Sequence, residues 1–129
     1  VPNTTLFPAY MVNDGGFVTH LLQVNPADTY TGTNANLLKN ISDSVKAFQD
    51  DLKGLGVDER VVGMTFSEFG RRIKSNSSGG TDHGAAAPMI LFGKNVTNAV
   101  WGNSPAIPVN APVNDNIPKQ YDFRSIAAS

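Results

Sequence analysis

The sequence of 129 residues contains no cysteine, two histidines and little charge. Without cysteine, the chain has no disulfides, no thiolate metal site and no cysteine nucleophile. Charged residues make up 16% of the sequence, against about a quarter in an average globular protein, and the net charge is -1. Nucleic acids and anionic membranes are bound by strongly basic surfaces. We therefore expect neither of them as a partner.

Long apolar runs are also missing. No segment reaches the roughly 20 residues needed to cross a bilayer, so no membrane span is expected. The first residues lack the basic stretch followed by an apolar one that marks a signal peptide. The chain begins with Val1 instead of methionine, and residues 121–129 are typical of a helix that has just begun. We expect a chain that has been processed, trimmed or cut from something longer.

The clearest secondary-structure signal predicts a helix over residues 34–53. Apolar side chains recur there at spacings of three and four residues, which places them in one stripe along a helix. They are Leu37, Leu38, Ile41, Val45, Phe48 and Leu52. Thr33 or Asn34 can cap the start of the helix, and Gly54 is the expected left-handed end. We interpret the stripe as core packing rather than as a partner-binding face.

Three short apolar runs predict strands, at residues 6–12, 60–66 and 89–92. The run at 60–66 is almost continuously apolar, as in a strand that is covered on both faces. A helix between two strands suggests a parallel crossover. The sequence therefore predicts an α/β fold, with a mostly parallel or mixed sheet flanked by helices, over residues 1–94. Residues 95–129 are expected to form a proline- and asparagine-rich tail that wraps the surface.

The most informative stretch is a glycine-rich loop at residues 78–84, Ser-Gly-Gly-Thr-Asp-His-Gly. Its Asp82 and His83 are adjacent, and both carboxylate oxygen and imidazole nitrogen bind zinc and other divalent ions. The flanking glycines permit a tight turn and the approach of a substrate oxyanion. The second histidine, His20, also follows a glycine pair, in residues 15–20. The alternative is that both histidines are ordinary hydrogen-bonded side chains.

Four segments together carry a resemblance to a known family. They are residues 15–20 (Gly-Gly-Phe-Val-Thr-His), 64–71 (Met-Thr-Phe-Ser-Glu-Phe-Gly-Arg), 79–84 (Gly-Gly-Thr-Asp-His-Gly) and 122–124 (Asp-Phe-Arg). In this order they resemble the C-terminal half of a large bacterial family that is exported by the twin-arginine route. Those proteins are sulfatase-like members of the alkaline phosphatase superfamily. The resemblance implies a sheet sandwiched by helices, a site for one or two metals, and hydrolysis of a phosphate or sulfate ester.

The resemblance also implies ligands at particular positions. Asp82 and His83 match the Asp-His metal ligands of the superfamily, and His20 matches the histidine of a Gly-Gly-Phe-Asp-Thr-His motif. The aspartate of that motif is replaced here by Val18, which has no donor atom. The nucleophile and the first metal-binding aspartate of the superfamily belong to an N-terminal half that is absent from this chain. The expected cofactor is a divalent ion, which is zinc, manganese or calcium.

Within such a site, metal ions neutralise the ester oxygens and lower the pKa of a bound water or hydroxyl. Arg71 or Arg72 can then bind the anionic group of an ester substrate in a bidentate way. Glu68 can orient a metal ligand. Glu68 and Arg71 are therefore the candidate catalytic residues. The alternatives are that the arginines are solvated or paired with Glu68, and that Glu68 caps the next turn.

Two functions are compatible with these residues. The first is a metal-binding segment of a sulfatase- or phosphatase-like hydrolase, incomplete or inactive as this chain. The second is a non-catalytic structural or binding protein on the same scaffold, with a decayed metal site. Retention of Asp82, His83 and Glu68 favours the first, whereas Val18 and the low charge favour the second. Both imply a periplasmic or extracellular location, and either a missing N-terminal half or a homo-oligomer as partner.

Overall fold

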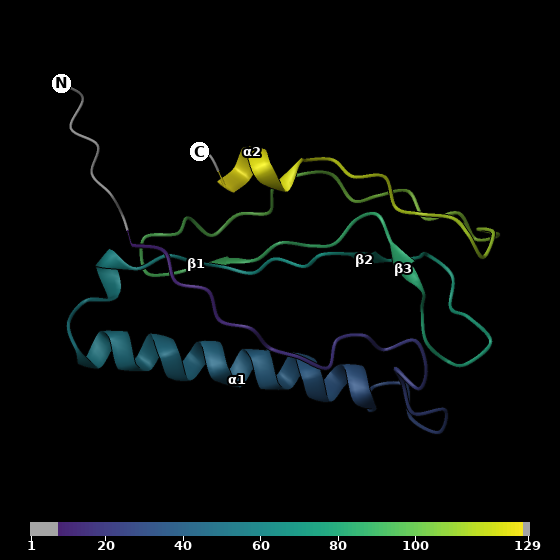
Figure 1. Ribbon diagram of the computed structural model, residues 1–129, viewed down its shortest axis with the longest axis horizontal. Helices are drawn as coiled ribbons and strands as arrows, with labels where there is room; N and C mark the ends of the chain where they lie inside the picture. Colours follow the sequence, from purple (N-terminus) through teal and green to yellow (C-terminus); the bar gives the residue numbers. More distant parts are fainter. Residues whose placement is uncertain (1–7, 128–129) are drawn as a thin grey trace.

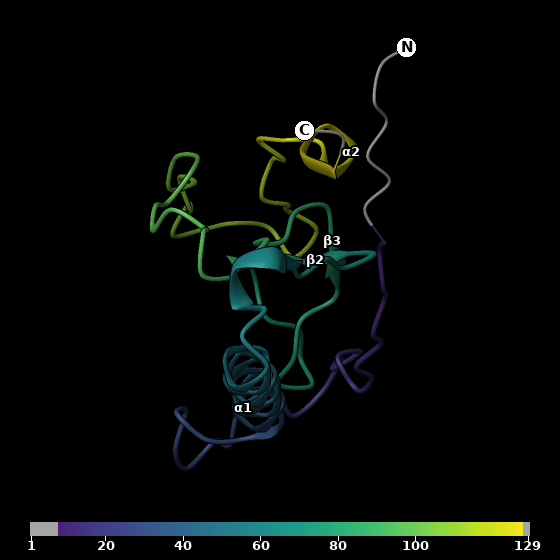
Figure 2. The ribbon, with the colours of Figure 1, turned by 90° about the vertical axis from the view of Figure 1, so that its left-hand side faces the viewer.

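The computed structural model describes residues 8–127, which are arranged in three layers. The long helix α1 (Thr33–Gly54) forms one outer layer, and α2 (Phe123–Ala127) with the chain before it forms the other. The middle layer holds a 3-10 turn, η1 (Asp58–Arg60), and four two-residue strands. Figures 1 and 2 show the strand layer between α1 and α2 in both views. No helix within the described range is long and apolar enough to cross a membrane.

The helix predicted from the apolar stripe is confirmed as α1, but its ends differ from those expected. The residue before the helix is Gly32, which offers no side-chain cap, instead of a capping threonine or asparagine. Gly54 lies inside the helix, and Leu55 follows it in a right-handed conformation. The amides of residues 55–57 donate to carbonyls in the last turn of the helix, so the chain continues past Gly54 before it turns away. The left-handed conformation comes at Gly56, with φ of 68°.

The apolar stripe of α1 is only partly covered. Leu52 is buried, at 7% exposed, whereas Leu38 and Phe48 are 55% and 46% exposed. The prediction of core packing is therefore confirmed for Leu52 and wrong for Leu38 and Phe48. A helix stripe is buried only where another layer lies against it, and these two side chains are largely uncovered.

The predicted parallel sheet is wrong. β1 (Gly63–Met64) pairs with β4 (Leu91–Phe92), β2 (Gly70–Arg71) pairs with β3 (His83–Gly84), and both pairs are antiparallel. No parallel pair occurs within residues 8–127, so the alkaline phosphatase- and sulfatase-like α/β sheet flanked by helices is overturned.

The physical reason is that the expected first strand does not form. Tyr10, Met11 and Val12 are 89%, 70% and 91% exposed, and residues 8–12 make no ladder within the described part of the chain. Residues 6 and 7 of the same prediction lie outside the described range. Without a strand before α1, the helix has no parallel crossover to complete. The apolar runs after α1 therefore pair with each other.

The two strand pairs belong to one interrupted ribbon. Gly63 faces Phe92, and Gly70 faces Gly84, so the register changes by one residue between the pairs. Thr65 N–H continues the first ladder by donating to the carbonyl of Ile90 at 2.9 Å. The extra residue lies in the segment that leads from β3 to β4 and has the character of a β-bulge. The ribbon carries the loop between β2 and β3 at its end, which is where the candidate site is built.

Glycine is required where the ribbon strands approach most closely. A Cβ on Gly70 would lie 1.6 Å from the carbonyl oxygen of Ala86, and one on Gly84 would lie 2.4 Å from the carbonyl carbon of Arg71. These positions allow β2 and β3 to lie flat against their neighbours. The apolar core is small, since Leu52 and Ala111 are the buried hydrophobic residues of the described range.

Candidate metal-binding site

The loop between β2 and β3 is shaped by the side chain of Asn76. Its Oδ1 accepts hydrogen bonds from the amides of Ser78 and Gly80 at 3.0 and 3.1 Å. The amide of Asn76 donates in turn to the carbonyl of Gly80 at 2.8 Å. Asparagine is suited to such a turn because its short side chain replaces a backbone acceptor. Gly79 completes the turn with φ of 70°, a left-handed conformation that glycine adopts at little cost.

The segment that carries His20 docks against this loop. The amides of Leu22 and Gln23 donate to the carbonyls of Ser78 and Gly79 at 3.1 and 3.0 Å. A Cβ on Gly80 would lie 2.4 Å from the carbonyl group of His20, so the contact requires glycine there. Two glycine-rich loops that are distant in sequence are thereby held together.

Docking brings His20 to Asp82. His20 Nδ1 lies 3.2 Å from Asp82 Oδ1. Asn76 Nδ2 donates to the same carboxylate oxygen at 3.1 Å and to the carbonyl of His20 at 2.7 Å. Asn76 therefore fixes both residues, and two of the three predicted metal ligands share one location.

His83 follows Asp82 at the start of β3, and its ring stacks on two other rings. The centroids of His83 and Phe69 are 3.6 Å apart with an interplanar angle of 9°. The centroids of His83 and His20 are 4.6 Å apart with an angle of 28°. Although His83 as a residue is exposed, its ring is covered by these neighbours. All three predicted ligands thus lie in one cluster.

Electrostatics set the charge of two members of the cluster. Hydrogen bonds from Asn76 and then His20 hold the pKa of Asp82 below its ordinary value, so the carboxylate is ionised at neutral pH. Desolvation lowers the pKa of His83, and the nearby His20 and Arg71 lower it further. A neutral imidazole at pH 7 is the form that binds a metal. Both groups are therefore in the protonation state that coordination requires.

Replacing Asn76 with alanine should raise the pKa of Asp82 toward its ordinary value. Because the folded-state pKa is lowered, the bond stabilises the fold above the unfolded value of about 3.9 and stops doing so as pH falls through the folded value. The difference in free energy of unfolding between the wild type and the variant should therefore become smaller as the pH falls. Urea unfolding from pH 2 to 7, with NMR titration of Asp82, measures both effects. Ser77→Ala is the control, and an Asp82 pKa unchanged by Asn76→Ala would contradict the assignment.

Arg71 lies beside the cluster, and its terminal nitrogens donate to backbone groups. Nη1 donates to the carbonyl of Thr81 at 2.6 Å, and Nη2 donates to the carbonyl of Phe17. Nη2 also lies 3.4 Å from Thr19 Oγ1, and the guanidinium carbon lies 5.3 Å from the centroid of Phe69. In this conformation Arg71 braces the two loops. Bidentate binding of an ester anion through both terminal nitrogens would require these carbonyls to be released.

The other predicted residues of this region lie outside the cluster. Glu68 is exposed and makes no hydrogen bond or ion pair with any described residue, so the predicted pairing with an arginine is not formed. Arg72 donates to the carbonyl of Asn114 in the tail. Val18 is 62% exposed, and its side chain has no donor atom.

Three polar residues that sequence reasoning missed support the site. Asn76 is the first, and the others are Gln23 and the buried Thr19. Gln23 Nε2 donates to Thr19 Oγ1 at 2.9 Å and to Thr81 Oγ1 at 3.0 Å. The signal for Asn76 was its position just before a Ser-Ser-Gly-Gly turn, where a side-chain acceptor is common. Nothing in the local pattern marks Gln23 or Thr19.

The residues present include donor types that bind divalent ions. His20 Nδ1 and Asp82 Oδ1 are bonded to each other at 3.2 Å, so these two atoms can bind one ion only after that bond is broken. No group of three or more histidine, cysteine, aspartate or glutamate side chains that could hold a metal ion occurs among the described residues. The cluster therefore supplies metal-binding donor types without a complete set of ligands.

Comparison with known proteins gives one finding. A family model described as a protein of unknown function (DUF1501) matches residues 12–120. Comparison with curated proteins gives no match, and neither does comparison with solved structures.

Proposed function

Because the chain belongs to the DUF1501 family of proteins of unknown function, we propose its function from its own site and motifs. His20, Asp82 and His83 form part of a divalent-metal site in a hydrolase of phosphate or sulfate esters. The observation that carries the proposal is the meeting of the two glycine-rich loops, which places His20 against Asp82 and stacks it on His83. The sulfatase-like resemblance of the same motifs supports the class of substrate.

The donor types favour zinc or manganese over calcium. Imidazole nitrogen binds zinc and other transition metals well, whereas calcium takes mostly oxygen ligands. Asp82 is kept as a carboxylate and His83 as a neutral imidazole, which avoids the cost of removing protons before binding. We therefore reduce the three ions expected from the sequence to two.

This chain's own residues hold the ligands in place. Asn76 fixes the Asp82 carboxylate, and Arg71 fixes the two loops from the other side. When bound, the metal supplies a Lewis acid for the ester oxygens and a bound water of lowered pKa. The positive charge of Arg71 and Arg72 near the cluster favours an anionic substrate over a neutral one.

Catalysis requires groups beyond this cluster. A two-histidine, one-carboxylate set leaves metal positions open, and a nucleophile for ester hydrolysis has no candidate among the three residues. The proposal therefore assigns to this chain the metal-binding part of the hydrolase and assigns the remaining groups to residues outside it. A periplasmic or extracellular location belongs to the same proposal, since it rests on the resemblance to exported proteins.

A non-catalytic binding protein with a decayed metal site is the second candidate. One residue that favours it is Val18, which stands where the motif of the resembled sulfatase-like family has an aspartate. The other is Arg71, whose terminal nitrogens donate to backbone carbonyls. In that case the cluster is a hydrogen-bonded brace between two loops.

Turnover of aryl phosphate and aryl sulfate by the complete translation product that contains this chain distinguishes the two functions. The proposal predicts hydrolysis of at least one ester, loss of activity on treatment with a chelator, and recovery on addition of zinc or manganese. Stoichiometric metal without turnover would favour the binding protein. Turnover that survives complete metal removal would contradict the metal-dependent proposal.

A further inference from the structure

The apolar run at residues 60–66 has a sequence that does not match its position. A nearly continuous apolar strand is typical of one covered on both faces and paired on both edges. The part of this run that forms a strand, β1, pairs with β4 in the structure. Isolated two-stranded ribbons are marginally stable, and they present unpaired backbone groups along their outer edges. The sequence is that of a central strand, whereas the position is that of an edge strand.

The backbone of the outer edge of β1 has no partner within the described residues. Thr65 N–H points to β4, since it donates to Ile90. Hydrogen-bonding direction alternates along an antiparallel strand, so Met64 directs its amide and carbonyl away from β4. Val62 and Phe66 have the same direction by their spacing of two residues. No described residue bonds to the backbone groups of these three.

The side chains on this strand are exposed as well. Val62, Met64 and Phe66 lie on one face by their alternation, and they are 61%, 38% and 58% exposed. A surface that is apolar in its side chains and unpaired in its backbone is a template for strand addition. A charged residue or proline, which protects natural edge strands, is missing from residues 61–66.

The total surface shows how much of the molecule is uncovered. The chain exposes 10502 Å², whereas a compact monomer of 13.7 kDa exposes about 6,600 Å². The difference is roughly 3,900 Å² over all 129 residues. One partner contributes about 800 Å² to an interface of standard size. The difference is therefore several times what one ordinary contact covers.

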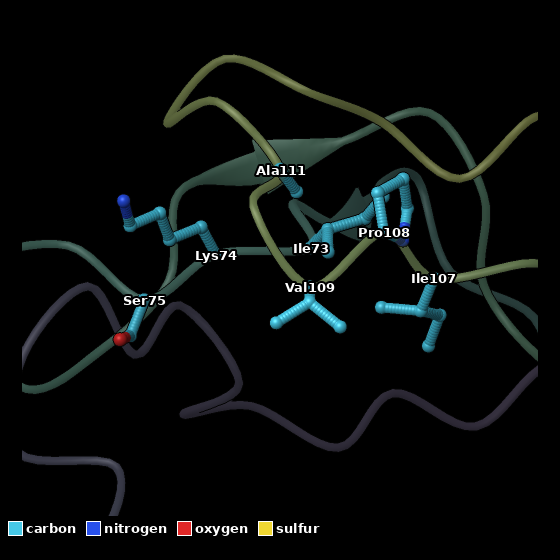
Figure 3. Close-up of a pocket in the computed structure, with 7 residues that line it drawn as sticks. All are labelled: Ile73, Lys74, Ser75, Ile107, Pro108, Val109 and Ala111. Carbon is cyan, nitrogen blue, oxygen red and sulfur yellow. The ribbon is translucent and has the colours of Figure 1, made fainter.

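The uncovered surface also includes two hollows with mixed apolar and polar linings. One is about 450 Å³ and lies between Lys74 and the tail, where Figure 3 shows the side chains of Ile107 and Val109 extending away from the ribbon. The other is about 460 Å³ and lies beside Arg71. Ile73 and Ile107 line both hollows. Val109 is 100% exposed. Both hollows are open at the surface, so side chains of another folded part can enter them.

We infer that a strand from a further folded part of the same polypeptide pairs with the outer edge of β1, and that apolar side chains of this part enter the hollows. A second copy of this chain is a poorer occupant. Uncovered apolar side chains lie in all three layers, at Leu38 on α1, at Phe66 after β1 and at Val109 in the tail. A two-fold related copy contacts one patch only. The inference is independent of the metal site.

Amide hydrogen exchange in the complete translation product that contains this chain tests the inference. The amides of Val62, Met64 and Phe66 should exchange at least tenfold more slowly than expected for an open edge, and as slowly as the ladder amide of Thr65. Sedimentation of the same sample gives its oligomeric state. Fast exchange at all three positions would overturn the inference. If the slow exchange occurs only in a dimer and disappears when the dimer dissociates, the edge is paired with a second copy. That result would also overturn the inference.

A pair of proline variants gives a second readout. Proline is tolerated where an amide faces solvent and disrupts a strand where the amide is bonded. Thr65→Pro should disrupt the ribbon in either case, because it removes the bond to Ile90. Met64→Pro should disrupt it equally if β1 is paired on its outer edge. A Met64→Pro protein that unfolds at the wild-type urea concentration would show that the edge is open and would overturn the inference. Metal content plays no part in either readout.

Discussion

Replacing Arg71 with alanine should lower the free energy of unfolding by about 3 kcal/mol. The guanidinium donates to the carbonyls of Thr81 and Phe17, which belong to the two loops that form the site. Hydrogen bonds from a charged donor each contribute about 1.5–3 kcal/mol, and the carbonyls would lose their partner. The variant should also separate His20 from Asp82, since Arg71 braces the loops on which they lie. Urea unfolding measures the first effect, and the NMR shifts of the His20 ring report the second.

Arg71→Lys is the matched control for charge. Lysine keeps the positive charge but has one nitrogen, which cannot reach two separate carbonyls in the way that the planar guanidinium does. Its stability should therefore be closer to the alanine variant than to wild type. Arg60→Ala, on the η1 turn, removes a charge away from the site and should have little effect. Wild-type stability in Arg71→Lys would show that charge, rather than bridging geometry, explains the role of Arg71.

The second large effect is expected for metal binding. His83→Ala and His20→Ala should each weaken zinc or manganese binding by at least about 100-fold, since loss of a partner outside the ligand sphere alone costs 10–100-fold. Asp82→Asn should weaken it similarly while keeping the hydrogen bond from Asn76 and the shape of the loop. Equilibrium dialysis against each metal, with circular dichroism to check folding, measures the effect in the complete translation product.

Controls for this series come from the same chain. Asp51→Asn removes an exposed carboxylate on α1, away from the cluster, and should leave metal affinity unchanged. Binding should also weaken as pH falls, because protons compete for the imidazoles and the carboxylate. Equal affinity in wild type, His83→Ala and His20→Ala would show that the metal is held elsewhere.

The sequence was enough to predict the long helix of the fold but not the pairing of its strands. The helix α1 follows from a stripe of apolar side chains at helical spacing, and a pattern of that length leaves little freedom. Apolar runs as short as residues 60–66 and 89–92 indicate strands but not which strands pair, because pairing is decided by the rest of the chain. The predicted crossover failed for this reason. Residues 8–12, which were expected to supply the first strand, are exposed and unpaired.

The site was predictable in its chemistry but not in its support. Asp82 and His83 were marked by their residue types within a glycine-rich loop, and His20 by a second such loop. The structure brings all three together. Asn76 was missed because its role depends on a turn that only the folded loop forms. Arg71 was expected to bind an anion, whereas its terminal nitrogens bind carbonyls that are ten and 54 residues away in sequence.

Anomalous X-ray diffraction from crystals of the complete translation product grown with zinc or manganese shows whether His20, Asp82 and His83 bind one ion. An anomalous peak is expected about 2.1 Å from a ring nitrogen of His20, a ring nitrogen of His83 and a carboxylate oxygen of Asp82. Further ligands to the peak should come from residues outside this chain. A metal bound at full occupancy elsewhere, with His20 still bonded directly to Asp82, would show that the cluster is a hydrogen-bonded brace and not a metal site.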